Sequence, residues 1–154
     1  MAIPSGLPGI KTTLSYMRNF VENYKIHPLI RGKAIQLTSL LPQKDYKGEI
    51  DKLYKFVQYN IRYVRDINGI ETVQSPVKTL EIGAGDCDDK STLLAALLES
   101  IGFKTRFHAM GFRKKHISHV LLEVYLNGKW LALETTEPVN MGWIPPRIKT
   151  TIYG

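Results

Sequence analysis

The chain of 154 residues has a single cysteine, Cys87, and this scarcity excludes several ways of holding a small protein together. One thiol makes no internal disulfide and supplies no multi-cysteine zinc site. Stability therefore has to come from packing, for which a chain of this length suffices as a single domain over residues 1–154. A lone free thiol also fits a reducing compartment.

Long hydrophobic runs are absent as well. The longest apolar run, Leu93 to Leu98, is far shorter than a membrane-spanning helix. The first residues, Met1 to Gly6, lack a basic segment followed by an apolar one, so no secretory signal peptide is predicted. We expect a soluble protein with no membrane partner, located in the cytoplasm.

Acidic residues are fewer than basic ones, with 14 Asp and Glu against 21 Lys and Arg and a formal net charge of +7. This excess favours encounter with acidic surfaces, nucleic acid or cell-wall polymers. The densest basic cluster, residues 113–116, lies between two predicted strands and is more typical of a solvated loop. Since no basic stripe with interleaved aromatics and no nucleic-acid motif is present, acidic surfaces are expected partners and nucleic acid is not.

Apolar spacing predicts an α+β protein whose first half is helical. Residues 1–10, with two prolines and two glycines, are expected to form a loosely held arm, and residues 66–78 a connecting loop that leads to a Gly83-Ala84-Gly85 turn. Helices are predicted over 11–24, 28–41, 46–62 and 87–101, the last ending at Gly102.

The second half is expected to form an antiparallel sheet against which the helices pack. Strands are predicted over 104–112, 118–126, 129–136 and, at an edge, 148–153. Asn127-Gly128 is the signature of a two-residue hairpin turn. That turn sets a register in which Tyr125 lies opposite Trp130 and Leu121 opposite Glu134.

Cys87 stands at the start of a predicted helix, within Gly85-Asp86-Cys87-Asp88-Asp89-Lys90. The positive helix end and its unpaired N–H groups favour a thiolate and can hold an oxyanion, so this position suggests a nucleophile. Asp86 is expected to cap the helix with Asp89, while Asp88 and Asp89 face away from the sulfur and are screened by solvent. The alternative is that Cys87 is a small buried hydrophobe.

The hairpin supplies partners for the thiol. In the predicted register His119 and Glu134 are diagonal neighbours on one sheet face, with Cβ atoms at most about 7 to 8 Å apart. A carboxylate can then orient the imidazole, and Cys87 projects inward from the helix to complete a nucleophile, base and acid. Glu137 has the wrong parity and precedes Pro138. The remaining histidines are expected to be structural or exposed, and His108 has no evident carboxylate partner: His27, His108 and His116.

With these residues in place, the chain resembles the transglutaminase-like superfamily of papain-like cysteine enzymes. Three parts carry the resemblance over roughly residues 46–140: Gly-Asp-Cys-Asp-Asp opening a Leu/Ala-rich helix, Ser118-His119-Val120 at a strand start, and Gly128-Lys129-Trp130 with an acid four residues after the tryptophan. A narrower likeness, to small stand-alone proteins of tailed phages, rests on Thr136-Glu137-Pro138 and Gly142-Trp143.

The resemblance implies Cys87 as nucleophile, His119 as general base and acid, and Glu134 in the acid position. The family usually has aspartate there, so with the longer glutamate His119 must sit farther away or the side chain must fold back. The Cys87 backbone N–H can supply one oxyanion donor, and Gln58 and Tyr63 are candidates for the second.

The leading hypothesis is therefore a cysteine peptidase or amide hydrolase acting on a protein or peptide, with protein transglutaminase or deamidase as alternatives. The rival class is a non-catalytic structural or binding module, such as a phage assembly or virion component that binds phage structural proteins. A metal site formed by Asp86, Asp88 and Asp89 is disfavoured, because these carboxylates lie at a helix start and not in a flexible loop. No cofactor is expected.

Overall fold

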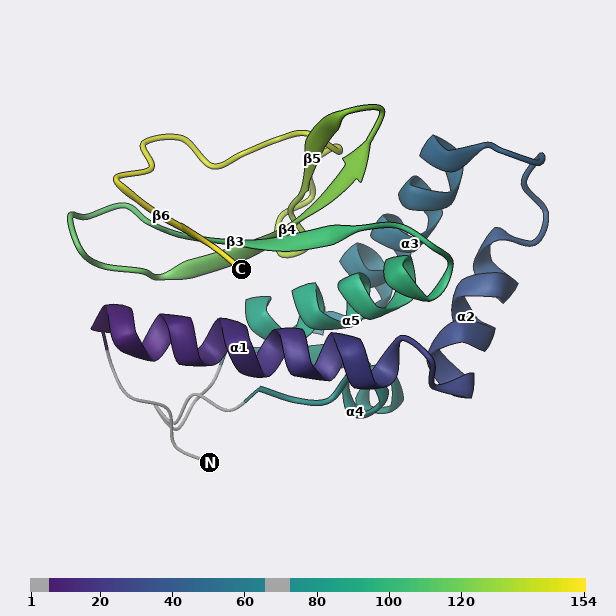
Figure 1. Cartoon of the computed structure of the whole chain (residues 1–154), viewed down its shortest axis with the longest axis horizontal. Coiled ribbons are helices and arrows are strands. Elements are labelled where there is room, and N and C mark those ends of the chain that lie inside the picture. Colours follow the sequence, from purple (N-terminus) through teal and green to yellow (C-terminus); the bar gives the residue numbers. More distant parts are fainter. Residues whose placement is uncertain (1–5, 66–72) are drawn as a thin grey trace.

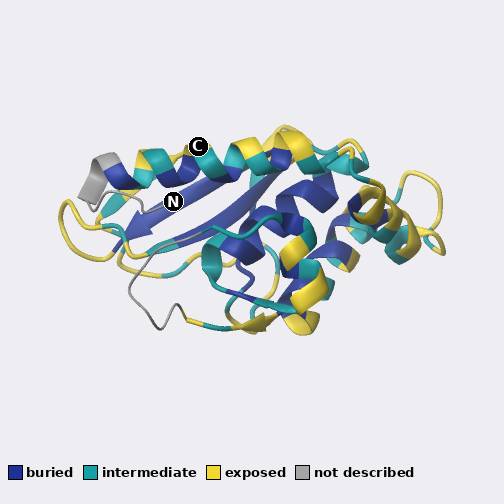
Figure 2. Cartoon of the chain, turned by 90° about the horizontal axis from the view of Figure 1, so that it is seen from below, coloured by how far each residue is buried: buried dark blue, intermediate teal, exposed yellow. Residues whose placement is uncertain are grey.

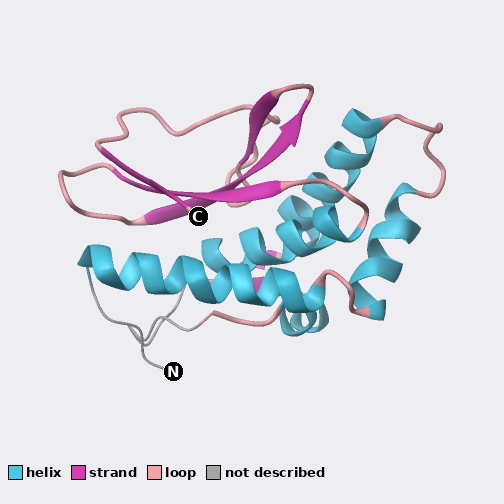
Figure 3. Cartoon of the chain, in the orientation of Figure 1, coloured by secondary structure: helices cyan, strands magenta, loops and turns pink. Residues whose placement is uncertain are grey.

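The computed structural model describes residues 6–65 and 73–154 and confirms an α+β architecture. A layer of helices packs against one face of an antiparallel sheet with strand order β5-β4-β3-β6 (Figures 1 and 3). The elements are, in chain order, α1 (Gly6–Tyr24), α2 (Pro28–Thr38), α3 (Tyr46–Asn60), β1 (Arg62–Tyr63), α4 (Pro76–Ile82), β2 (Ala84–Gly85), α5 (Cys87–Ser100), β3 (Thr105–Gly111), β4 (His119–Leu126), β5 (Lys129–Leu133) and β6 (Thr150–Tyr153).

Helix α5 is the centre of the core. It lies between the sheet and the other helices, and every residue from Asp89 to Leu98 is buried. Two alanines within this stretch, Ala95 and Ala96, are fully buried and let neighbouring elements approach closely. Buried residues gather in these inner elements, whereas the exposed ones mark the outer helix surfaces and the loops (Figure 2).

The hairpin has the predicted register. Tyr125 pairs with Trp130 and Leu126 with Lys129. The turn residues Asn127 and Gly128 have φ of 52° and 80°, as a two-residue turn that follows the strand twist requires. The ladder ends at Leu122 and Leu133, so β5 is three residues shorter than predicted.

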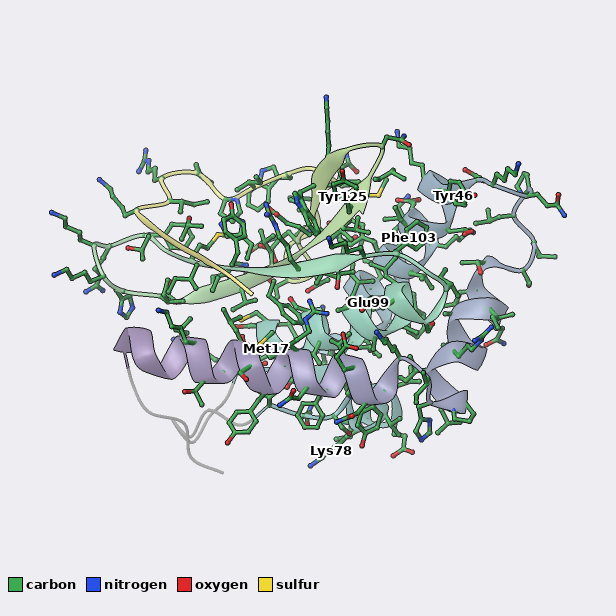
Figure 4. The ribbon with its side chains drawn as sticks, viewed as in Figure 1. Met17, Tyr46, Lys78, Glu99, Phe103 and Tyr125 are labelled. Carbon is green, nitrogen blue, oxygen red and sulfur yellow. The ribbon has the colours of Figure 1, made fainter. Side chains whose placement is uncertain are left out.

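Alternation along β4 gives the sheet two different faces. Val120, Leu122 and Val124 belong to the main core beneath the helices. Leu121 faces the other way, into a small cluster with Met110, Ala132 and Ile148 under the segment that connects β5 to β6. In Figure 4, Tyr125 stands on the sheet side of the molecule, while Met17 of α1 lies between that helix and the sheet.

The predicted loop over 66–78 contains a helix at its end, which is a correction. Residues 66–72 lie outside the described residues, but α4 begins at Pro76 with Ser75 as its N-cap, whose hydroxyl accepts from the Lys78 N–H (3.2 Å). Gly83 ends this helix with a φ of 71°, a conformation that glycine adopts without steric cost. The Ser-Pro start and glycine stop were therefore readable signals of a short helix.

The predicted N-terminal arm is also too long, because α1 begins at Gly6 and Ile10 packs against the core. Helix α2 ends at Thr38, three residues before the predicted end.

Tyr46 of α3 lies beside Phe103, which follows α5 (Figure 4). The two rings meet edge to face with centroids 6.2 Å apart.

Two very short parallel strands were not predicted. Arg62 pairs with Ala84 and Tyr63 with Gly85, and the Val64 N–H donates to the Gly85 carbonyl (3.0 Å). This pairing holds the end of α3 beside the residues that precede α5. Within the described residues, no helix is long and apolar enough to cross a membrane.

Candidate active site

Cys87 is the first residue of α5 and is partly exposed. The predicted capping box is present: the Asp86 carboxylate accepts from the Asp89 N–H (3.0 Å), and the Asp89 carboxylate accepts from the Asp86 N–H (3.2 Å). This reciprocal cap fixes where the helix begins and hence the position of the sulfur.

His119 opens β4, where the chain enters the sheet. Its side chain is 18% exposed, and its Nε2 lies 2.5 Å from Oε2 of Glu134. Among the described residues, the other ring nitrogen, Nδ1, has no hydrogen-bond partner. The predicted contact between these two side chains is therefore made, and it leaves the second nitrogen free to meet a thiol or a substrate.

Glu134 lies directly after β5 and is 1% exposed. Oε2 contacts His119, while Oε1 accepts from the Thr136 N–H (3.2 Å) and from its hydroxyl (2.9 Å). The carboxylate thus turns back over its own chain, as expected for a glutamate in the position of a shorter acid.

Two polar side chains of α3, Tyr54 and Gln58, bind the backbone of the segment from Glu134 to Val139. The Tyr54 hydroxyl lies 2.8 Å from the Glu134 carbonyl and 2.7 Å from the Val139 carbonyl. The Gln58 amide nitrogen lies 2.6 Å from the Glu137 carbonyl and 3.1 Å from the Tyr54 hydroxyl. The apolar periodicity of α3 identified Tyr54 only as a core residue. Nothing in the local sequence showed that its hydroxyl binds the backbone carbonyl of Glu134.

These contacts correct the expectation that Gln58 is an oxyanion donor. Its amide is engaged with carbonyls of the 137–139 segment, and Gln58 lines neither cavity at the site. Tyr63 is placed differently: the β1–β2 pairing sets it beside the start of α5, and it lines both cavities. Of the two candidates, only Tyr63 faces the site.

Two cavities meet at His119. One, of about 260 Å³, is lined by Cys87 and His119 together with Asp86, Asp88 and Arg65. The other, of about 390 Å³, is lined by residues from three parts of the chain: Tyr63, Phe112, Ser118, His119, Glu134, Thr136, Glu137, Trp143 and Pro145. The thiol and the imidazole therefore open onto one space, and the imidazole and the acid onto the other.

The electrostatics of the thiol differ from the expectation. Burial raises the pKa of Cys87 well above its usual value, and the carboxylates of Asp88 and Asp86 raise it further. The thiol donates to Oδ1 of Asp88 over 3.6 Å, so Asp88 does not face away from the sulfur. Asp89 is buried, not screened by solvent. A backbone hydrogen bond from Val120 opposes these effects but is the weaker influence, so the free site favours a neutral thiol.

Lys90, one helical turn after Cys87, is a buried lysine near the Glu134 carboxylate. It is 2% exposed, and its Nζ donates to the Gln58 carbonyl (3.4 Å). Burial lowers the pKa of Lys90 to about 8, while the nearby Glu134 carboxylate acts in the opposite direction. Sequence reasoning treated this lysine only as part of the helix start.

Of the other histidines, His116 is exposed, while His27 and His108 have structural roles, with one correction. His27 caps α2 by accepting from the Leu29 N–H (3.1 Å). His108, for which no carboxylate partner was evident, lies 3.2 Å from Glu123, which also pairs with Arg106 at 2.6 Å. The antiparallel pairing of β3 and β4 creates this contact, so single-strand reasoning could not find it.

The residues at the start of α5 do not form a metal site. Asp86 and both oxygens of Asp89 are engaged with backbone N–H groups, among them that of Gln74 (2.7 Å), and Asp88 contacts the thiol. No group of three His, Cys, Asp or Glu side chains within the described residues is arranged to hold a metal ion.

The helix N-terminal cysteine, the strand histidine and its carboxylate partner, on this helix-and-sheet scaffold, define the class of papain-like folds. The model of the transglutaminase-like superfamily matches residues 35–135, well over half of the chain. The chain therefore belongs to the transglutaminase-like superfamily.

Solved structures agree on the fold. A proposed protease from Parabacteroides distasonis has a TM-score of 0.65 at 14% identity, over 82% of this chain and 26% of that one. A proposed cysteine protease from Cytophaga hutchinsonii has a TM-score of 0.60 at 18% identity, over 80% and 43%. Legionella pneumophila LapG, in its EGTA-treated form, has a TM-score of 0.60 at 19% identity, over 97% and 81%.

The chain thus spans about a quarter of the first of these proteins and less than half of the second. LapG has also been solved with calcium bound, with a TM-score of 0.56 and 21% identity. In the present chain the capping contacts already engage Asp86 and Asp89, and Asp88 contacts the thiol. No curated protein sequence matches the chain.

Proposed function

We propose that the chain is a cysteine-dependent acyl-transfer enzyme that hydrolyses amide bonds of a protein or peptide, with Cys87 as nucleophile, His119 as general base and acid, and Glu134 as the orienting acid. One observation carries the proposal. His119 is held at Nε2 by a buried carboxylate and lines the same cavity as the sole thiol of the chain. This is the arrangement that nucleophilic acyl transfer requires.

The proposed reaction has two stages, acylation of Cys87 and hydrolysis of the thioester. The imidazole accepts the proton of the Cys87 thiol as the sulfur attacks the amide carbonyl, which forms a tetrahedral oxyanion. Collapse breaks the C–N bond, and the amine leaves with the proton that His119 held. Water, deprotonated by His119, then attacks the thioester, and the acid is released as the thiol regains its proton.

The carboxylate acts through the imidazole. Because Glu134 accepts at Nε2, it favours the tautomer that carries a proton there and leaves Nδ1 as the base. It also stabilises the imidazolium that forms during attack. This support matters here because the thiol starts neutral, so the proton has to move during the attack and not before it.

For the oxyanion we propose two donors. One is the backbone N–H of Cys87, at the first position of α5, where N–H groups have no partner within the helix. The other is the hydroxyl of Tyr63, whose side chain lines the cavity of the thiol.

Hydrolysis is proposed over transamidation because two structural relatives are named as proposed proteases. The narrower predictions of a kinship with phage proteins, phage structural proteins as partners and a cytoplasmic location stay predictions.

The test measures all three outcomes of a thioester. The purified protein is incubated with a synthetic peptide library and a labelled primary amine, and mass spectrometry scores new termini, glutamine deamidation and amine incorporation. We expect new termini that vanish in Cys87→Ala and His119→Ala, with unchanged circular dichroism. Labelled peptides would reassign the enzyme as a transglutaminase, and deamidation as a deamidase. No turnover would instead support a non-catalytic binding module, and turnover unaffected by Cys87→Ala would exclude Cys87 as the nucleophile.

A further inference from the structure

The two cavities at His119 are not equivalent, because Cys87 lines only one of them. During acyl transfer the acyl carbon is bonded to the sulfur, so the acyl part of the substrate occupies the cavity of about 260 Å³. The leaving amine takes its proton from the imidazole, which both cavities share. The larger cavity, of about 390 Å³, is therefore placed to receive what is attached to that amine.

Part of the wall of the larger cavity is aromatic and open to solvent. Phe112 is 39% exposed, Trp143 38% and Tyr63 49%, and Pro145 also lines the cavity. The aromatic side chains come from the loop after β3, the segment after β5 and the β1 strand. Rigid aromatic surfaces of this kind bury an aliphatic stem at low entropic cost, and their faces attract a cation.

The same cavity is acidic in a chain of net charge +7. Its lining includes the carboxylates of Glu134 and Glu137 and no lysine or arginine. Glu134 is engaged by His119 and Thr136. Within the described residues the Glu137 carboxylate makes no ion pair or hydrogen bond, and its backbone is held by Gln58, whose amide donates to the Glu137 carbonyl (2.6 Å).

Resting on the proposed function, we infer that the larger cavity binds the side chain of the residue on the amine side of the scissile bond, and that this side chain is lysine or arginine. Its aliphatic stem lies along Phe112 and Trp143, and its cationic end pairs with Glu137. A leucine would use the wall but leave the carboxylate without a partner. An acidic side chain would be repelled by Glu137.

The test identifies the first residue of each new N-terminus after cleavage of a synthetic peptide library by the full chain. We expect lysine and arginine there about fivefold above leucine, the upper range for one exposed ion pair. Glu137→Gln should remove most of this preference, and Glu137→Lys should shift it toward aspartate and glutamate. The matched control is Glu81→Gln, an exposed acid on α4 that lines neither cavity, and it should keep the wild-type profile.

The outcomes separate this inference from the function on which it rests. The assigned subsite is overturned if cleavage depends on Cys87 but shows no preference for lysine or arginine. It is also overturned if Glu137→Lys leaves that preference in place. Both results leave the proposed hydrolase activity standing. Absence of any cleavage that depends on Cys87 overturns both. Loss of overall cleavage in Glu137→Gln without a change in profile would assign Glu137 to the support of the hairpin end, which also contradicts the inference.

Discussion

The carboxylate of Asp88 should be a major reason why the thiol of Cys87 is a weak acid, and Asp88→Asn tests this directly. Sγ and Oδ1 are 3.6 Å apart, and Asp88 is among the groups that raise the pKa of the thiol. Asparagine keeps the size and polarity of the side chain and removes only the charge. The pKa of Cys87 should therefore fall.

The size of the fall follows from Coulomb's law. Two unit charges at this separation repel by about 1 kcal/mol in a medium like water and about 5 kcal/mol at an effective dielectric constant of about 20. Because the Asp88 carboxylate is partly exposed, solvent screens the pair and the lower end applies. At about 1.4 kcal/mol per pKa unit, the pKa of Cys87 should fall by about one unit.

The assay is the rate of iodoacetamide alkylation of Cys87, the sole thiol, measured as a function of pH. The midpoint of the wild-type profile should lie above the ordinary value of about 8.5 for a free cysteine, and that of Asp88→Asn about one unit lower. Glu49→Gln is the matched control, since Glu49 also occupies the first turn of a helix but lines neither cavity.

A wild-type midpoint at about 8.5 would refute the raised pKa of Cys87, and only a midpoint well below about 7 would restore a thiolate paired with an imidazolium. A midpoint that Asp88→Asn leaves in place, with Glu49→Gln as reference, would refute the role of Asp88. Thermal unfolding of each variant shows whether a change in midpoint reflects lost folding, because removing an acid from a first helical turn costs about 0.3 to 1 kcal/mol.

Three further changes test other parts of the structure. Glu134→Gln should lower kcat/KM about 10- to 150-fold, the equivalent of a charged hydrogen bond of about 1.5 to 3 kcal/mol to His119, and an unchanged rate would contradict the triad. In wild type, the pKa of Lys90 is about 8 in the folded protein and higher in the unfolded chain, so the unfolded chain binds more protons between pH 8 and 10.5 and the unfolding free energy should rise by about 3 kcal/mol over that range. Lys90→Met should remove this rise when both proteins lack the Cys87 thiol. Unfolding free energies from denaturant titrations that depend on pH equally in the two proteins would refute this. Gly111→Ala should destabilise by at least about 2 kcal/mol, because the new Cβ would lie 1.4 Å from the backbone oxygen of His116; an unchanged melting temperature would contradict the close approach.

The elements governed by local signals were predictable. The hairpin register followed from Asn127-Gly128, and with it the shared face of His119 and Glu134. The start of α5 followed from the capping residues. In each case a short stretch of sequence determines the geometry because the interaction spans only a few residues.

Features that depend on distant partners were not predictable. The strand β1 has two residues and exists because Tyr63 pairs with Gly85, more than twenty positions away. The Tyr54 hydroxyl reaches Glu134 across 80 positions. The effect of Asp88 on the thiol was wrongly predicted, because a helical wheel gives the direction of a side chain but not its rotamer. The rotamer of Asp88 brings its carboxylate back to the sulfur of Cys87.

The glutamate in the acid position follows from where β5 stops. Glu134 lies beyond the last ladder pair and must reach His119 with one oxygen and Thr136 with the other. An aspartate is one methylene shorter, so it could hold both contacts only if the chain after Leu133 moved toward His119. The Tyr54 hydroxyl, bound to the carbonyl of residue 134, resists that movement. Glu134→Asp should therefore lose activity although it restores the acid usual in the family.

The neutral thiol separates two kinds of reactivity. A small alkylating agent reacts with the thiolate, so its rate is limited by the raised pKa of Cys87. An amide substrate that fills the cavity shared by Cys87 and His119 expels water and lets the imidazole take the proton as the C–S bond forms, so its rate is limited by how well Glu134 supports the imidazolium. Glu134→Gln should accordingly slow amide cleavage far more than alkylation, whereas Asp88→Asn should speed alkylation. Parallel changes in both rates would mean that the thiol ionises before attack.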